Sequence, residues 1–299
     1  MNKSFLILIL LTFSIYSYGQ TATDYYKRAV NKYKNKEYAV AIIEYTRAID
    51  KRPNAAVLYN NRGICKYKLE RFSEAISDYE QAIKLDANYK HAYFNKGNSH
   101  LGVLEFDAAL LSYDKTLELD SFYFKAYPNR AKVFYHFGDY KASIKDLNKA
   151  IESRSISKPE KLYLQRANAE MALEKYDNAI DDYTQAISEN ADYYKAYINR
   201  GQCYFKMENY EKAIDDFTLS MRLDPSSGEG YFYRGLVYIA KTSGVKAQKK
   251  DKNTVALIKE NKVLISMACS DFNKAKSFSY ERAYEAIKEY CDGVKIKKR

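Results

Sequence analysis

Apolar side chains recur along most of the chain at the three-and-four spacing of amphipathic helices. In residues 56–85 they form two such stretches, separated by the short, non-periodic segment Leu69-Glu70-Arg71. Spacings of three and four residues place side chains on one face of a helix. The pattern therefore predicts two helices that are joined by a tight turn, each with one apolar face.

This two-helix pattern returns about every 34 residues. A tyrosine opens each first helix at Tyr25, Tyr59, Tyr93, Tyr127, Tyr163, Tyr197 and Tyr231. Four residues later stands a small residue: Ala29, Gly63, Gly97, Ala131, Ala167, Gly201 and Gly235. Inside the second helices stand large aromatic residues: Tyr45, Tyr79, Tyr113, Tyr183 and Phe217. Two helices approach closely where a small residue on one meets a large residue on the other, so we expect these columns to pack together.

The columns resemble the tetratricopeptide repeat, with tyrosine where that family has tryptophan. The matching blocks are 22–55, 56–89, 90–123, 124–157, 160–193 and 194–227, followed by an altered seventh block, 228–278. The resemblance implies an all-α fold, a right-handed superhelical solenoid of antiparallel helix pairs with about seven units over residues 20–293. A solenoid needs a polar-faced cap, and residues 279–293 are the candidate.

Two departures from the period are expected to alter the array. Lys158-Pro159 lengthens one step to 36 residues and predicts a changed superhelical angle there. In the seventh block the small column runs from Ala213 to Ala268, which is 21 residues more than the period. We therefore expect an insertion near residues 241–262, between the two helices of that block.

The N-terminus has the layout of a secretory signal peptide. Lys3 precedes an apolar run of nine residues, 5–13, and small residues follow up to Gly19. The run is too short to span a bilayer as a helix, and no cysteine stands at the expected cleavage point. The sequence predicts removal of residues 1–19 and an exported, soluble protein of the periplasm or the exterior, not a lipoprotein.

The positive charge is concentrated at the C-terminal end. Of the formal net charge of +11, residues 241–262 contribute seven lysines against two acids, and the tail 294–299 adds four basic residues. The repeats themselves are nearly neutral, which argues against a nucleic-acid-binding face. Solvated segments are one interpretation of this basic end. Contact with an anionic lipid, a glycan or an acidic partner is the other.

Residues of catalytic or metal-binding type are few and scattered. His91, His100 and His136 lie at no metal-ligand spacing, and the sequence has neither a His-Glu-x-x-His motif nor a glycine-rich phosphate loop. Asp181-Asp182 and Asp215-Asp216 occupy equivalent places in two second helices, where we expect a solvated outer face. We therefore expect a protein without catalytic activity, cofactor or metal.

The four cysteines divide into two pairs. Cys65 and Cys203 occupy the same place in blocks four repeats apart, beyond disulfide reach, and are predicted to be buried thiols. Cys269 and Cys291 fall in helices that should be antiparallel neighbours. For this pair the alternatives are a disulfide, which would contribute about 3 kcal/mol, and two more buried thiols.

In the family the first helices line a concave groove. Amides and lysines occupy the corresponding positions at Asn61, Asn95, Asn98, Lys125, Asn129, Lys132, Lys161, Gln165, Asn168, Lys195, Asn199 and Gln202. Asparagine can hold the backbone of an extended peptide, and lysine adds donors for carboxylates. This resembles the basic-and-amide clamp with which some members hold acidic C-terminal peptides, although asparagine stands where that clamp has arginine. The alternative is that runs such as Asn61-Arg62-Gly63 only support hydrogen bonds between repeats.

Two functional hypotheses follow from this groove. The first is a protein–protein interaction scaffold of the bacterial cell envelope, which binds peptide segments or complex partners. The second is a solenoid that binds carbohydrate or cell wall, with groove amides and the rings of Tyr67, Tyr135 and Phe205 against sugars.

Overall fold

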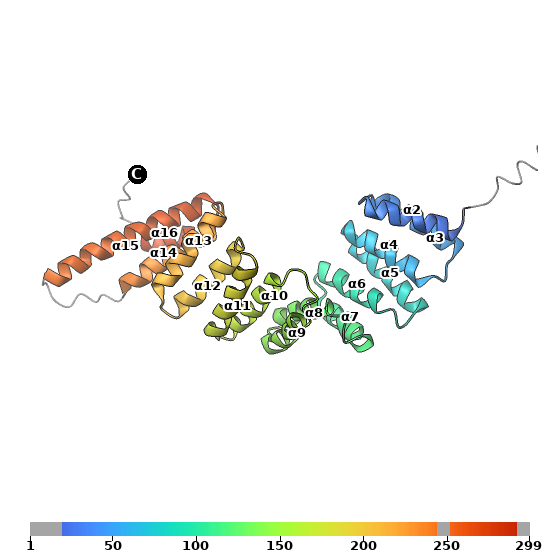
Figure 1. Ribbon diagram of the computed structural model, residues 1–299. Coiled ribbons are helices and arrows are strands. Elements are labelled where there is room, and N and C mark those ends of the chain that lie inside the picture. The colour runs from blue at the N-terminus through green and yellow to red at the C-terminus, as the bar shows by residue number, and fades with distance from the viewer. Residues whose placement is uncertain (1–19, 244–251, 292–299) are drawn as a thin grey trace, which may run out of the picture. The chain divides into compact units, whose positions relative to one another are not determined.

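In the computed structural model the described residues are 20–243 and 252–291, and every regular element in them is a helix (Figure 1). The predicted signal peptide 1–19 and basic tail 294–299 lie outside these residues. The chain divides into two compact units, Met1–Val133 and Phe134–Arg299. The boundary between them falls inside helix α8 (Ala126–His136).

The first unit consists of three consecutive helix pairs followed by the start of α8. Its helices are α2 (Ala22–Lys34), α3 (Tyr38–Lys51), α4 (Ala56–Lys68), α5 (Phe72–Leu85), α6 (Lys90–Gly102) and α7 (Phe106–Leu119). Each helix packs against the next in sequence, and the first helices α4 and α6 also touch each other. Contact between first helices gathers them on one side of the unit.

The second unit continues the same order. Its helices are α9 (Tyr140–Glu152), α10 (Glu160–Ala172), α11 (Tyr176–Glu189), α12 (Tyr194–Lys206), α13 (Tyr210–Leu223), α14 (Gly228–Ser243), α15 (Lys252–Ser277) and α16 (Arg282–Tyr290). First helices again touch, α10 with α12 and α12 with α14. The prediction of an all-α array of helix pairs is confirmed.

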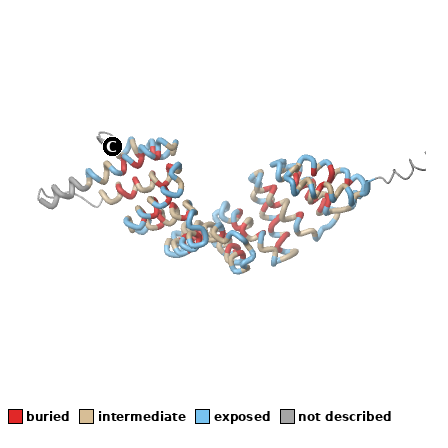
Figure 2. The backbone as a smooth tube through the Cα atoms, turned by 45° about the horizontal axis from the view of Figure 1, so that its top comes forward, coloured by how far each residue is buried: buried red, intermediate tan, exposed pale blue. Residues whose placement is uncertain are grey.

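The predicted packing of small residues on aromatic rings is also confirmed. A methyl group added to Gly63 would stand 2.7 Å from Cε1 of Tyr79, and one added to Gly97 would stand 2.7 Å from Cε1 of Tyr113. Tyr79 and Tyr113 are fully buried. Figure 2 shows that buried residues follow the helix surfaces that face one another within each unit. Much of the tyrosine surplus therefore forms the core.

A tight turn joins the two helices of a pair, as predicted for Leu69-Glu70-Arg71. Glu70 has a left-handed backbone, with φ of 59°, and the Arg71 N–H donates to the Lys66 carbonyl at 3.0 Å. The same carbonyl, in the last turn of α4, also accepts from the Leu69 N–H at 3.0 Å, so the turn residues satisfy carbonyls that have no partner within the helix. The turn reverses the chain within three residues and brings the two helices side by side.

Four helix pairs each contain an ion pair between an arginine of the first helix and a buried aspartate of the second, and two of them correct the expectation of a solvated outer face. The ion pairs are Arg62–Asp78, Arg166–Asp182, Arg200–Asp216 and Arg234–Asp271. In the first, both carboxylate oxygens of Asp78 accept from Arg62, at 2.9 and 2.7 Å. The predicted solvated face was wrong for Asp182 and Asp216, which are buried. In the first three of these ion pairs the tight turn places residues 16 apart opposite each other, so each carboxylate lies against the guanidinium of the facing helix. Arg234 and Asp271 are 37 residues apart and meet in the same way between α14 and α15.

These arginines also join neighbouring repeats. Nη1 of Arg62 donates to Oγ1 of Thr46 in the preceding pair at 3.1 Å, and Nη1 of Arg200 donates to Oγ1 of Thr184 at 2.9 Å. The runs that contain these arginines therefore support hydrogen bonds between repeats, which was the alternative interpretation of Asn61-Arg62-Gly63.

The seventh pair differs from the insertion expected at residues 241–262. Helix α14 runs to Ser243, and α15 begins at Lys252 and is 26 residues long, so residues 252–262 belong to the second helix. Residues 244–251 lie outside the described residues. The segment 252–262 contains neither glycine nor proline, and nothing in its sequence stops a helix that already covers Ala268.

A disulfide joins Cys269 in α15 to Cys291, the residue that ends α16. Around it, Phe232, Phe272 and Tyr290 form the core of the last pair and its capping helix. Cys65 and Cys203 are buried free thiols, as predicted, and burial raises the pKa of each to about 12. The changed superhelical angle at Lys158-Pro159 stays a prediction.

Candidate functional site

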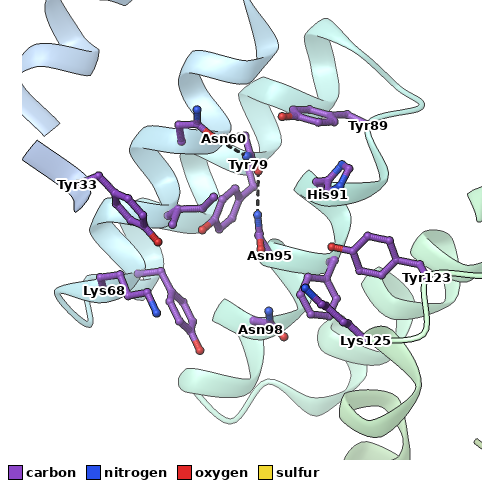
Figure 3. Close-up of a pocket in the computed structure, with 14 residues that line it drawn as sticks. Tyr33, Asn60, Lys68, Tyr79, Tyr89, His91, Asn95, Asn98, Tyr123 and Lys125 are labelled. Atoms are coloured by element: carbon purple, nitrogen blue, oxygen red, sulfur yellow. Dashed lines mark hydrogen bonds between the residues drawn. The ribbon is translucent and has the colours of Figure 1, made fainter. Parts of the chain in front are cut away.

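A cavity of about 600 Å³ lies on the side of the first unit where α4 and α6 meet (Figure 3). Four of the predicted groove residues line it: Asn61, Asn95, Asn98 and Lys125. The first helices supply most of the wall, because their contact brings the same helix faces together in consecutive repeats. The structure therefore gathers the N-terminal part of the predicted groove into one site.

Most of the remaining wall is aromatic, and of its rings only that of Tyr67 was predicted to face the groove. Its rings belong to Tyr33, Tyr67, Tyr79, Tyr89, His91, Phe94 and Tyr123. A sequence signal was present, since Tyr89 and Tyr123 each stand at the last position of a block, 34 residues apart. Lys68 is a second cation in the wall, and none of the lining residues is an aspartate or glutamate.

His91 lies in the first turn of α6, between two tyrosine rings. Its ring centroid is 5.8 Å from that of Tyr89 and 5.5 Å from that of Tyr123, both in edge-on contact. Burial lowers the pKa of His91, and the neighbouring Lys90 and Lys125 act in the same direction. The imidazole is therefore neutral at pH 7, and the positive charge of the cavity comes from its lysines.

The asparagines of this site form hydrogen bonds to one another. Nδ2 of Asn95 donates to Oδ1 of Asn60 at 3.0 Å, and Nδ2 of Asn60 donates to Oδ1 of Asn61 at 3.2 Å. Further along, Oδ1 of Asn98 accepts from Nδ2 of Asn129 at 2.8 Å. The bonds from Asn95 and from Asn129 cross from one repeat to the next, and all three bonds restrict which atoms of these amides face the cavity.

The other predicted groove residues lie on α8, α10 and α12. Asn129 and Lys132 belong to α8, and in the second unit Lys161, Gln165 and Asn168 belong to α10 while Lys195, Asn199 and Gln202 belong to α12. Oδ1 of Asn168 accepts from Nδ2 of Asn199 at 2.9 Å. Lys161 and Lys195 are exposed. Each unit therefore carries its own set of amides and lysines on its first helices.

The aromatic residues suggested for stacking on sugars are held by rings of their own repeats. Tyr67 contacts Phe72 at 5.4 Å between ring centroids, Tyr135 contacts Tyr140 at 5.1 Å and Phe205 contacts Tyr210 at 6.1 Å. Each pair spans the tight turn of one helix pair. Of the three, only Tyr67 lines the cavity of the first unit.

Two further properties of the described residues bear on function. Among residues 20–243 and 252–291 no group of three or more His, Cys, Asp or Glu side chains is arranged to hold a metal ion. Across the same ranges no helix combines the length and the apolar character that crossing a membrane requires.

Family profiles described as tetratricopeptide repeat match residues 56–89, 94–157, 160–193 and 194–227, which is more than half of the sequence. The chain belongs to the tetratricopeptide repeat family. Proteins of this family act as protein–protein interaction scaffolds and are generally not enzymes. No curated protein matches the sequence.

Solved structures share the fold at low sequence identity. A tetratricopeptide repeat protein from Parabacteroides merdae is 20% identical with a TM-score of 0.62, covering 92% of this chain and 98% of its own. The C-terminal part of a repeat protein from Cytophaga hutchinsonii is 17% identical with a TM-score of 0.64, covering 88% and 99%. YrrB, described as having an unusual peptide-binding site, is 23% identical with a TM-score of 0.53, covering 70% and 97%.

Proposed function

We propose that this protein is an exported scaffold that holds extended, acidic peptide segments of its partners against the first helices of the array. The observation that carries this proposal is the composition of the cavity in the first unit. Its polar wall consists of amides, tyrosines, His91, Lys68 and Lys125, without a carboxylate. Amides suit peptide backbone, and lysines favour acidic side chains.

The same composition argues against the carbohydrate alternative. The tyrosine rings and amides of the cavity suit sugar rings, which is the observation in favour of it. However, sugar hydroxyl groups need acceptors as well as donors, and Oδ1 of Asn60, Asn61 and Asn98 already accepts bonds from neighbouring side chains. Lys68 and Lys125 are donors only, and they match the carbonyl and carboxylate groups of a peptide better.

Export is part of the proposal and rests on the N-terminal sequence. The disulfide between Cys269 and Cys291 supports it, because such bonds persist in oxidising compartments. N-terminal sequencing of the protein from the envelope fraction of a bacterial host should find a mature chain that begins at Gln20. An intact chain that begins at Met1 and is found only in the cytosol would contradict export.

Binding is tested with capped, fluorescent peptides of acidic, neutral and basic composition, measured by anisotropy. We expect the acidic series to bind, and Lys125→Glu to weaken that binding about tenfold, since it reverses a charge in the cavity wall. The matched control is Lys84→Glu, an exposed lysine of α5 that does not line the cavity.

Equal loss in both variants would mean that only net charge matters and would remove the cavity from the proposal. Absence of peptide binding together with binding on a glycan array would favour the carbohydrate alternative. Both the peptide and the glycan measurements use the full chain with its disulfide formed.

A further inference from the structure

A set of four side chains occurs twice in the chain, 70 residues apart. The first set is Asn98, Tyr113, Lys125 and Asn129, and the second is Asn168, Tyr183, Lys195 and Asn199. The first lies in the first unit and the second in the second unit. In each set the two asparagines and the lysine belong to the groove positions, while the tyrosine comes from the core of a second helix. The sequence pattern alone did not connect this tyrosine to the groove.

The hydrogen bonds of the two sets are the same. Oδ1 of Asn98 accepts from the Tyr113 hydroxyl at 2.8 Å and from Nδ2 of Asn129 at 2.8 Å. Oδ1 of Asn168 accepts from the Tyr183 hydroxyl at 2.6 Å and from Nδ2 of Asn199 at 2.9 Å. In each set the tyrosine donates from the second helix of the same pair, and the second asparagine donates from the first helix of the next pair.

These bonds fix the orientation of the first asparagine in each set. A carboxamide oxygen has two lone pairs, and in Asn98 and Asn168 both are used by the two donors. Burial raises the pKa of the Tyr113 hydroxyl and of the Tyr183 hydroxyl, so both remain donors at any physiological pH. A flipped amide would set its own N–H groups against these donors, so the flipped orientation is strongly disfavoured.

The Nδ2 group of each of these asparagines is left for a ligand. Asn98 and Asn168 are partly exposed, and no hydrogen bond engages their Nδ2 atoms within the described part of the chain. Asn98 lines the cavity together with Lys125 (Figure 3). The equivalent lysine of the second set, Lys195, is exposed. Each set therefore has one amide whose two N–H groups are oriented for donation, and a lysine at the same sequence offset from it, which in the first set lines the same cavity.

A neighbouring junction shows what happens when one member of the set is missing. Tyr79 occupies the place of Tyr113, but Ile64 stands where Asn98 would be, and in the described residues the buried Tyr79 hydroxyl lies near Ser99 and bonds to no asparagine. Nδ2 of Asn95 turns to Asn60 instead. The oriented amide thus depends on the whole set and is not a general property of the repeat.

We propose that each set is a station for one carboxylate group of an acidic peptide, in which Asn98 or Asn168 donates its amide hydrogens and Lys125 or Lys195 supplies the charge. Tyr113 and Tyr183 are positioning residues that hold the amide in its donor orientation. The chain then has two stations, one in each unit. This inference rests on the proposed binding of acidic peptides.

The two stations should differ in affinity. Glu229 of α14 lies near Lys195, where burial raises the pKa of the glutamate while Lys195 and Arg282 oppose that rise. An acidic neighbour reduces the attraction of Lys195 for a second carboxylate. Lys125 lines a cavity without a carboxylate, so the first station should bind more tightly.

The experiment uses the full oxidised chain and a short capped peptide with one glutamate, together with its glutamine counterpart. Isothermal titration calorimetry should give two sites per chain, and the glutamate peptide should bind about tenfold more tightly than the glutamine peptide, as expected for charge-assisted hydrogen bonds. Tyr113→Phe and Tyr183→Phe keep the rings and remove only the hydroxyls. Combining them should bring the ratio of the two affinities close to one.

The ratio separates positioning from a merely structural role, since a structural defect would weaken both peptides alike. Tyr79→Phe, which removes a hydroxyl outside the sets, should leave the ratio unchanged. A single site per chain, or an unchanged ratio in the double variant, would overturn the inference while leaving the proposed function in place. If the wild-type chain binds neither peptide nor any of the acidic series, the proposed function itself fails.

Discussion

The second and third repeats, residues 56–89 and 90–123, share one packing pattern and differ in the polar groups that lie around it. In the second, Asp78 is buried between Arg62 and Lys66, each with a nitrogen within 2.8 Å of the carboxylate. In the third, Lys96 stands in place of Arg62 and Ser112 in place of Asp78.

The replacement groups in the third repeat bond elsewhere. Lys96 pairs with Glu80 of the preceding repeat, whose side chain is 57% exposed, whereas that of Asp78 is 5% exposed. The Ser112 hydroxyl donates to the Ala108 carbonyl of its own helix at 2.8 Å. The comparison teaches that the glycine–tyrosine contact is common to both repeats, while the polar groups beside it can form a buried ion pair in one repeat and bond separately, one of them to an exposed partner, in the other.

The largest expected effect comes from Asp78→Ala. It leaves Arg62 and Lys66 without their shared carboxylate in a mostly buried position, and we expect a loss of about 3 kcal/mol in the free energy of unfolding. The matched variant Ser112→Ala removes one local hydrogen bond and should cost less than about 1 kcal/mol. Urea denaturation of the two variants measures the difference. Equal losses would show that the ion pair does not distinguish the repeats.

A second test builds the ion pair into the third repeat. Ser112→Asp alone places a carboxylate at a buried position opposite Lys96, which is already paired, and should cost about 2 kcal/mol. Adding Lys96→Arg should recover most of this loss, because arginine can reach both oxygens. A double-mutant cycle measures the coupling. A coupling energy near zero would mean that the third repeat cannot accept the arrangement of the second.

A third test asks whether packing is equal in the two repeats. Gly63→Ala and Gly97→Ala each push a methyl group to 2.7 Å from a fully buried tyrosine ring, so each should cost about 1 to 2 kcal/mol even after the gain in helix propensity. We expect the two losses to agree within about 0.5 kcal/mol. A large difference in urea midpoint would place part of the contrast in packing rather than in polar groups.

The smallest effect separates the two core hydroxyls. Tyr113→Phe removes the bond to Asn98 and should cost about 1 kcal/mol, a typical value for one hydrogen bond. Tyr79→Phe removes a hydroxyl that has no bond in the described residues and should change stability by less than about 0.5 kcal/mol. If Tyr79→Phe proves the more costly change in thermal unfolding, the hydroxyl of Tyr79 has a partner that the comparison omits.

The fold could be predicted because its main contacts repeat. The column of small residues that includes Gly63 and Gly97 and the column of aromatics that includes Tyr79 and Tyr113 stand at fixed separations, and the pairing follows from helix geometry. The buried state of Asp182 and Asp216 could not be predicted this way. A carboxylate on a helix is solvated unless a cation of another helix meets it, and that partner is visible only in three dimensions.

The candidate site was predicted in part for a similar reason. Asn61, Asn95, Asn98 and Lys125 were found because the repeat positions that face the groove are known from the resemblance, and the structure brings them into one cavity. Most of its aromatic wall was missed, for example Tyr89 and Tyr123, which fall at junctions between blocks and outside the groove positions of the first helices. The contribution of Tyr113 was missed because a core residue was not expected to place its hydroxyl in the groove.

The disulfide between Cys269 and Cys291 should determine which end of the array unfolds first. In a stack of repeats, opening starts at the ends, where a repeat has one neighbour instead of two. The bond ties the capping helix α16 to α15, while at the other end of the described array the start of α2 is held by hydrogen bonds, which are the capping box of Thr21 and Asp24 and the bond from Arg28 to Gln20. Partial unfolding under heat or denaturant should therefore begin at α2 and proceed towards α16.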